Sequence, residues 1–201
     1  MRYRTLMTTV ALFATALAGP AFAAAGDECV KVLGYEWSGE KQSMDPADMH
    51  SGDDAYHTFA VYNRLLDVDD NFQTIPELAT EWSVSPDGLT WTFKLREGVK
   101  FHSGKDFTAA DVVYTFKRYF DPDLGSGAKA VLEFLDPEGI KAVDSHTVSF
   151  TTKNTVVEFP ILISNKFTNI VPDGAKHEDL RLKADGTGPF MQEQFTPNDP
   201  V

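Results

Sequence analysis

The sequence predicts an α+β fold, and two adjoining patterns near its middle indicate it. In residues 89–96, apolar and polar side chains alternate with a period of two, which is typical of a half-buried strand. Residues 109–119 then carry apolar side chains at helical spacing. Together the two patterns indicate an ordered α+β module.

The strand at residues 89–96 is predicted to form one half of a β-hairpin. The preceding Pro86-Asp87-Gly88 favours a turn, because proline presets φ and glycine accepts positive φ without a Cβ clash. Residues 81–84 are the candidate partner strand. Trp82 and Trp91 fall within this pattern, so we expect them to belong to the core rather than to a ligand pocket.

The helix is expected to begin after Thr108. Asp111 follows three residues later, and a hydroxyl followed by a carboxylate at this spacing is typical of a capping box. Val112 and Phe116 lie at helical spacing within the segment. Asp121-Pro122 ends the helix, because proline disfavours the helical conformation in the residue before it.

Further elements are predicted on both sides of this module. Residues 30–35 form a short apolar run that is typical of a buried strand, and residues 55–66 have helical spacing that closes at Leu65-Leu66. In residues 143–152 an alternating pattern predicts another strand, with Val148 and Phe150 inward. The apolar run at residues 159–163 is compatible with either a helix or a strand.

The first residues have the pattern of a secretory signal. Arg2 and Arg4 precede a short apolar core at residues 6–17, and Ala21-Phe22-Ala23 matches a cleavage site. Cleavage is expected after Ala23, with Ala25 as the alternative. The apolar core is shorter than the roughly 20 residues that a membrane-spanning helix needs.

Charge and cysteine content restrict the function classes. The formal net charge is −12, and removing the two arginines of the signal gives −14, which argues against nucleic acid and anionic membranes as partners. Cys29 is the only cysteine. Acidic residues directly before it argue against a lipoprotein anchor, so it is either a free thiol or pairs with a cysteine outside this sequence.

No motif in the sequence indicates catalysis or a metal site. The glycines of Gly186-Thr187-Gly188 lack the lysine and the strand-to-helix context of a phosphate loop, so they indicate a turn. Cys29 has no activating context that would make it a nucleophile. The histidines show no metal-ligand spacing and are expected at the surface. They are His50, His57, His102, His146 and His177.

Residues 78–118 resemble the signature region of the family 5 extracellular solute-binding proteins, the peptide/nickel class that serves bacterial ABC importers. Met44-Asp45-Pro46, Glu77-Leu78-Ala79 and Gly186–Phe190 match further landmarks of that family in the same order. The resemblance implies a two-lobe periplasmic-binding-protein type II-like fold, of which this chain holds most of the first lobe. Members of the family are more than twice as long, so we expect an N-terminal fragment.

The resemblance also implies a division of the chain. Residues 1–23 are the signal peptide, and residues 24–66 form the first part of the core subdomain of lobe I. Residues 67–183 form a smaller inserted subdomain, and residues 184–201 return to the core subdomain.

A ligand-binding segment is implied at His50, Ser51, Gly52 and Asp53. In peptide-binding relatives the segment after the Asp-Pro pair runs along the cleft between the lobes and hydrogen-bonds the ligand backbone, which is β-augmentation. An ordinary solvated loop is the alternative. Trp37 is a separate pocket candidate, because it lies in a loop beyond a predicted buried strand.

The implied function is that of a periplasmic solute-binding component of an ABC importer. It would capture a peptide or similar solute as a monomer and deliver it to a membrane permease and ATPase pair, with no reaction and no cofactor. Two alternatives stay open: a periplasmic ligand sensor for a chemoreceptor, and a truncated fragment without function. The architecture does not name the ligand.

Overall fold

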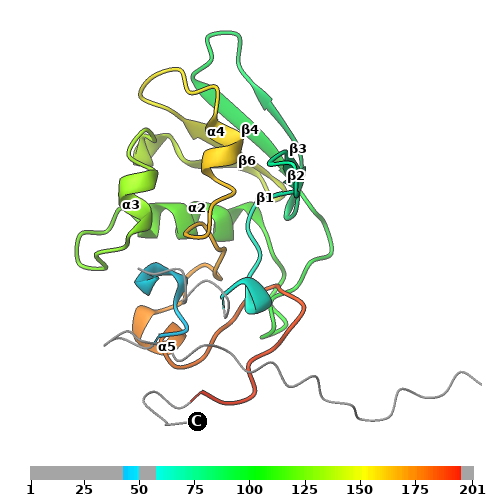
Figure 1. Ribbon diagram of the computed structural model, residues 1–201, viewed down its shortest axis with the longest axis vertical. Helices are drawn as coiled ribbons and strands as arrows, with labels where there is room; N and C mark the ends of the chain where they lie inside the picture. Colours follow the sequence, from blue (N-terminus) through cyan, green and yellow to red (C-terminus); the bar gives the residue numbers. More distant parts are fainter. Residues whose placement is uncertain (1–42, 50–57, 196–201) are drawn as a thin grey trace, which may run out of the picture. The chain divides into compact units, whose positions relative to one another are not determined.

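Four antiparallel strands form the main sheet of the protein. The computed structural model describes residues 43–49 and 58–195, and the sheet has the strand order β3-β4-β6-β5 (Figure 1). The central strands β4 and β6 pair Trp91 with Phe150 and Phe93 with Val148, so their apolar residues share one face. The strands are β3 (Ala79–Val84), β4 (Thr90–Leu95), β5 (Lys141–Asp144) and β6 (Thr147–Thr151).

The predicted hairpin is confirmed as β3 and β4. Its turn is closed by a hydrogen bond from the Gly88 amide to the Ser85 carbonyl (2.8 Å). Gly88 has a φ of +74°, and a Cβ there would also lie 2.8 Å from Cγ2 of Thr155. Glycine is therefore required for both conformation and space. Trp91 and Phe93 are buried as predicted.

The capped helix is confirmed as α2 (Ala109–Arg118). The Asp111 carboxylate accepts from the Thr108 amide (2.7 Å) and from the Thr108 hydroxyl (3.0 Å), which satisfies donors at the helix start. Val112 and Phe116 are fully buried, and α2 packs against β5 and β6 (Figure 1). Arg118 is the last residue of α2. The packing of α2 on the sheet therefore determines where the Arg118 side chain lies.

The strand predicted at residues 143–152 is confirmed as β6, but it begins later than expected, because the first residues of this segment belong to β5 and to a turn. The Asp144 carboxylate accepts from the His146 amide (2.8 Å), which stabilises this tight turn between the two strands. The predicted inward positions of Val148 and Phe150 are confirmed, since both are buried. An aspartate that hydrogen-bonds the backbone two residues later thus interrupts the alternation.

The helix predicted at residues 55–66 ends earlier than expected. Residues 58–61 are helical, and Leu66 already begins β1 (Leu66–Val68), which pairs with β2 (Thr74–Pro76). The Leu65 carbonyl accepts from the Ala79 amide (2.8 Å). Tertiary pairing with the start of β3 therefore replaces the last predicted turn of the helix.

Short elements complete the described part of the chain. The ambiguous run at residues 159–163 is the helix α4 (Phe159–Leu162). The predicted strand at residues 30–35, the signal and Cys29 lie outside the described residues. The other short elements are η1 (Pro46–Asp48), α3 (Ala128–Val131), η2 (Pro137–Gly139) and α5 (His177–Leu180).

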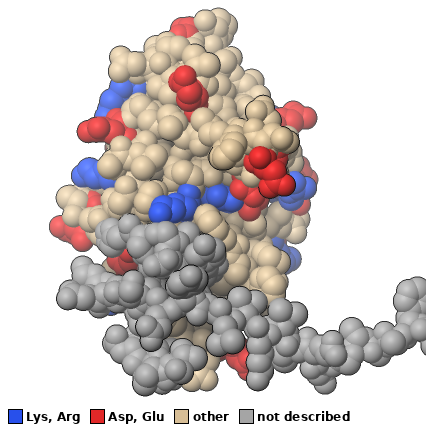
Figure 2. All heavy atoms as spheres, in the orientation of Figure 1, with Lys and Arg blue, Asp and Glu red and all other residues tan. Residues whose placement is uncertain are grey.

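On the face shown in Figure 2, acidic and basic side chains are interspersed. Within residues 43–49 and 58–195, no helix has the length and apolar character needed to cross a membrane.

Phe159 occupies the centre of an aromatic cluster in the main core. Its ring stacks on Trp91 at a centroid distance of 5.3 Å and contacts Phe93 (5.7 Å), Phe134 (5.5 Å) and Phe150 (5.7 Å). Phe159 itself is fully buried. Through this cluster α4 packs on the same apolar face of the sheet that α2 covers.

Substituting Phe159→Ala is expected to lower the free energy of unfolding by about 3–5 kcal/mol, because it removes a buried ring and leaves a cavity. Urea denaturation followed by circular dichroism measures this change. Phe72→Ala is the matched control, since Phe72 is 80% exposed, and it should change stability by less than about 0.5 kcal/mol. Equal losses in the two variants would contradict the packing described here.

Candidate functional site

The predicted ligand-binding residues lie outside the described part of the chain. This holds for His50, Ser51, Gly52 and Asp53 and for Trp37. The structure does describe the residues on either side of the segment, 43–49 before it and 58 onward after it. The geometry of these flanking residues shows how the two ends of the segment are held.

Asp45 organises the residues before the segment. As the N-cap of η1 it accepts a hydrogen bond from the Ala47 amide (2.9 Å), and its own amide donates to the Ser43 hydroxyl (3.1 Å). Pro46 occupies the first position of η1, where its fixed φ and missing amide hydrogen are favourable. Met49, the last described residue before the segment, is buried. The path of the chain up to the segment is therefore fixed.

The Asp45 carboxylate forms a buried ion pair with Arg118. Nη1 of Arg118 donates to Oδ1 (2.8 Å) and Nη2 donates to Oδ2, so the pair is bidentate. The side chains are only 7% and 0% exposed. Burial acts to lower the pKa of Arg118, but the hydrogen bonds and charge of Asp45 raise it overall. The guanidinium therefore stays charged against the carboxylate.

His177 is the second partner of Asp45. Its Nδ1 lies 2.9 Å from Oδ2 of Asp45, and its Nε2 lies 3.6 Å from Oδ1 of Asp48. An ionised carboxylate only accepts hydrogen bonds, so Nδ1 carries the proton that it donates to Asp45. Arg181 contributes a further ion pair to Asp48 at 3.7 Å. The helix α5 is thereby fastened to η1.

Tyr62 connects the two flanks of the segment. Its hydroxyl donates to the Met44 carbonyl (3.0 Å), and its amide donates to the Thr58 carbonyl (2.7 Å). Burial, with the nearby charge of Asp45, strongly raises the pKa of the Tyr62 hydroxyl, which therefore remains a neutral donor. Both flanking residues, Met49 and Thr58, are buried. The segment between them begins and ends on anchored residues.

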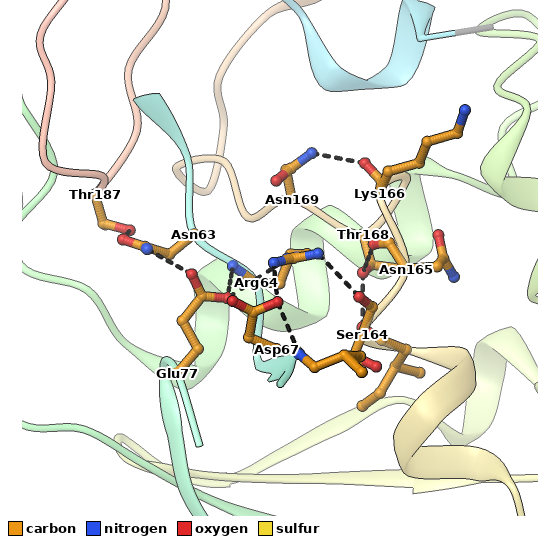
Figure 3. Close-up of polar contacts among 12 residues, drawn as sticks. Asn63, Arg64, Asp67, Glu77, Ser164, Asn165, Lys166, Thr168, Asn169 and Thr187 are labelled. Atoms are coloured by element: carbon orange, nitrogen blue, oxygen red, sulfur yellow. Dashed lines mark hydrogen bonds and ion pairs between the residues drawn. The ribbon is translucent and has the colours of Figure 1, made fainter. Parts of the chain in front are cut away.

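A second polar network joins the chain after Tyr62 to the returning glycine segment (Figure 3). Asn63 donates from Nδ2 to Oε1 of Glu77 (2.6 Å), and its Oδ1 accepts from the Thr187 hydroxyl (2.9 Å). Glu77 also accepts from the Arg64 amide (2.8 Å). Arg64 in turn donates from Nη1 to the Ser164 carbonyl (2.9 Å). Burial raises the pKa of the Glu77 carboxyl, and its bonds to Asn63 and Arg64 only partly offset this.

The glycines near the end of the chain allow two backbones to approach closely. The Gly188 amide donates to the Val61 carbonyl (2.8 Å). A Cβ at Gly186 would lie 2.0 Å from the Val61 carbonyl oxygen, so no larger residue fits. His102 holds the same segment, because its amide donates to the Gly186 carbonyl (2.9 Å) and its Nε2 lies 2.9 Å from the Gly188 carbonyl.

The three histidines that the structure describes, His102, His146 and His177, are partly exposed, and each also forms a hydrogen bond. His50 and His57 lie outside the described residues. Within the described ranges no group of three or more histidine, cysteine, aspartate or glutamate side chains is arranged to hold a metal ion.

A surface hollow of about 490 Å³ lies beside α5. Its lining is a mixture of charged and apolar side chains, including His102, Lys176 and Leu180.

Comparisons with known proteins show the family to which the chain belongs. Residues 73–201 match the family model described as bacterial extracellular solute-binding proteins, family 5 Middle. The chain belongs to family 5 of these proteins. The relatives that it matches are solute-binding proteins by name, and the family is extracellular by description.

Two relatives illustrate the range of the family. Di/tripeptide-binding protein 1 of Pseudomonas aeruginosa is 34% identical over 184 residues, which cover 78% of this chain and 34% of the relative. Heme-binding protein A of Haemophilus influenzae is 36% identical over 157 residues, covering 65% of this chain and 28% of the relative. The chain thus spans about a third of the length of these relatives.

Solved structures show the fold. The binding protein AgaA of A. tumefaciens R10, solved with agropinic acid, has a TM-score of 0.71 and 28% identity over 79% of this chain and 32% of its own. OppA of Burkholderia pseudomallei has a TM-score of 0.67 and 27% identity, covering 79% of this chain and 35% of its own. The predicted α+β, type II periplasmic-binding-protein fold is therefore confirmed for the part that this chain covers.

Replacing Arg118 with Met should lower the free energy of unfolding by about 3–5 kcal/mol, because the Asp45 carboxylate would remain buried without its counter-charge. Denaturant titration measures the loss. Lys100→Met removes a cation from the exposed Lys100–Asp106 pair and should cost less than about 1 kcal/mol. A loss in Arg118→Met as small as in this control would refute the importance of the pair.

The raised pKa of Glu77 predicts a pH effect on stability. Because the folded-state pKa lies above the ordinary value of 4.5, folding favours the protonated carboxyl. The protonated Glu77 carboxyl therefore contributes to the free energy of unfolding at lower pH, and this contribution is lost as pH rises through the raised pKa. The stability of Glu77→Gln relative to wild type should therefore increase between about pH 4 and 7. Urea titrations at several pH values test this trend, with Glu133→Gln as an exposed control, and a falling difference would contradict it.

Proposed function

We propose that the protein is a solute-binding component of an ABC importer and that its ligand is a peptide or a chemically similar solute. The observation that carries this proposal is the 34% identity over 184 residues to a di/tripeptide-binding protein. The structural match to AgaA, solved with agropinic acid, supports the same class of function. The chain supplies most of the first lobe of such a protein.

The proposed division of that lobe follows the path of the chain. Residues 24–66 and 184–201 form a discontinuous core subdomain, and residues 67–183 form the inserted one. The hydrogen bond from Gly188 to Val61 supports this proposal, because it joins the two parts of the proposed core subdomain.

We propose His50, Ser51, Gly52 and Asp53 as the ligand-contacting segment, with Trp37 as a further pocket residue. The support is the anchoring of both flanks, since a segment that binds by backbone hydrogen bonds must be held in a defined position. Ser51 and Gly52 are small enough to allow a second backbone to approach. His50 and Asp53 supply side chains that are able to interact with a charged group of the ligand.

The proposed location is the periplasm, reached through the signal at residues 1–23. The proposed partners are a membrane permease and an ATPase, and the protein acts as a monomer without a cofactor. Transport by this class requires binding and release, so no catalytic group is assigned.

A thermal-shift screen of di- and tripeptides on the full-length gene product tests the function. A ligand present at 100 times its Kd should stabilise the protein by about 2.7 kcal/mol, which raises the melting temperature by several degrees. Isothermal titration calorimetry then gives the affinity. The absence of any stabilising compound among peptides, opines and haem would contradict the proposal.

A further inference from the structure

The turn between β1 and β2 holds the chain in a strained conformation. Within residues 43–49 and 58–195, Phe72 is the one non-glycine residue with a positive φ, at 60°. A Cβ crowds the backbone in this region, so glycine or asparagine is the usual occupant and a bulky aromatic residue is rare. Strain of this kind persists where surrounding interactions fix it, and it is concentrated at functional positions.

Hydrogen bonds to Asp69 fix this turn. The Asp69 carboxylate accepts from the amides of Asn71 (2.9 Å) and Gln73 (2.8 Å). The Asp69 carbonyl accepts from the Phe72 amide (2.9 Å), and the Asp69 amide donates to the Gln73 carbonyl (2.9 Å). The turn is therefore pre-organised, and the backbone of Phe72 is held in one position.

The ring of Phe72 lies outside the core. Its exposed fraction of 80% is the largest among the large hydrophobic residues that the structure describes, and Ile75 on β2 is 37% exposed. A single exposed apolar side chain is ordinary on a protein surface, but here it stands on a strained backbone that glycine would adopt freely. Folding does not account for a phenylalanine at this position. Contact with a partner does, because aromatic rings are enriched in protein interfaces.

Charge around the turn restricts the kind of partner. Residues 65–93, which include β1, β2 and β3, contain no lysine or arginine. Arg64 contacts two of the acidic side chains in this segment, so their negative charge is only partly balanced. A surface with basic side chains around an apolar pocket complements the segment, whereas an anionic membrane would repel it. The acidic residues are Asp67, Asp69, Asp70, Glu77, Glu81 and Asp87.

We propose that the β1–β2 turn is a docking site for a membrane-protein partner, with the Phe72 ring inserted into an apolar pocket that basic side chains surround. This inference rests on the proposed function, under which the partner is the permease of the importer. The ring supplies apolar contact area, and the pre-organised turn limits the entropy that docking costs. The acidic side chains increase the rate of encounter.

The test measures binding of the full-length gene product to the permease–ATPase complex of the importer, held in nanodiscs of zwitterionic lipid. Phe72→Ala should weaken this binding about tenfold or more, while affinity for a peptide from the thermal-shift screen stays within about twofold of wild type. Phe72→Gly should cause the same loss, and it excludes misfolding as the cause because glycine suits a positive φ. Val157→Ala is the matched control, since Val157 is 76% exposed, and it should leave both affinities unchanged.

The ionic-strength dependence of binding tests the charge of the partner. Asp70 is exposed beside the turn, and Asp70→Asn should slow association with the complex about two- to threefold at low salt and less at high salt. An unchanged association rate would overturn the basic character assigned to the pocket.

Wild-type affinity for the complex in Phe72→Ala and Phe72→Gly would overturn the docking site. Equal binding to empty nanodiscs would also overturn it, because the partner would then be the lipid surface. If wild type binds no peptide, the proposed function fails and the docking site fails with it. If wild type binds peptide but not the complex, the docking site alone fails.

Discussion

The buried ion pair between Asp45 and Arg118 is the interaction that connects η1 to α2. It joins residues 73 positions apart and places two charges where they are almost completely buried. Burying such charges is costly unless geometry and further hydrogen bonds compensate. Here the bidentate contact, the Ala47 amide and His177 together use both carboxylate oxygens. The burial of the two charges is compensated only in this arrangement. The ion pair therefore fixes the position of η1 as well as contributing to stability.

The rest of the described fold supports that pair. The aromatic core around Phe159 holds the sheet, the sheet holds α2, and the last turn of α2 presents Arg118 to Asp45. Tyr62 and His177 complete the attachment of the flanking residues from two other directions.

Much of the fold follows from local sequence, whereas the candidate site does not. The alternation in β4 and the capping box of α2 are local patterns, and both were correctly predicted from neighbouring residues. The early end of the helix after residue 61 was missed because the Leu65 carbonyl pairs with β3, which is a tertiary effect. The contact of His177 with Asp45 was not predicted, because no spacing rule links the two residues. An Asp-Pro pair and an arginine at the end of a helix are both common in sequences. Only the fold therefore shows that Asp45 and Arg118 are in contact.

A double-mutant cycle of Asp45→Asn and Arg118→Met, measured by urea denaturation, tests the central claim most directly. If the buried pair governs this region, the double variant should be more stable than the sum of the two single losses predicts, with a coupling energy of at least about 2 kcal/mol. A coupling below about 0.5 kcal/mol would mean that the two residues act independently. It would contradict the view that their contact holds η1 in place.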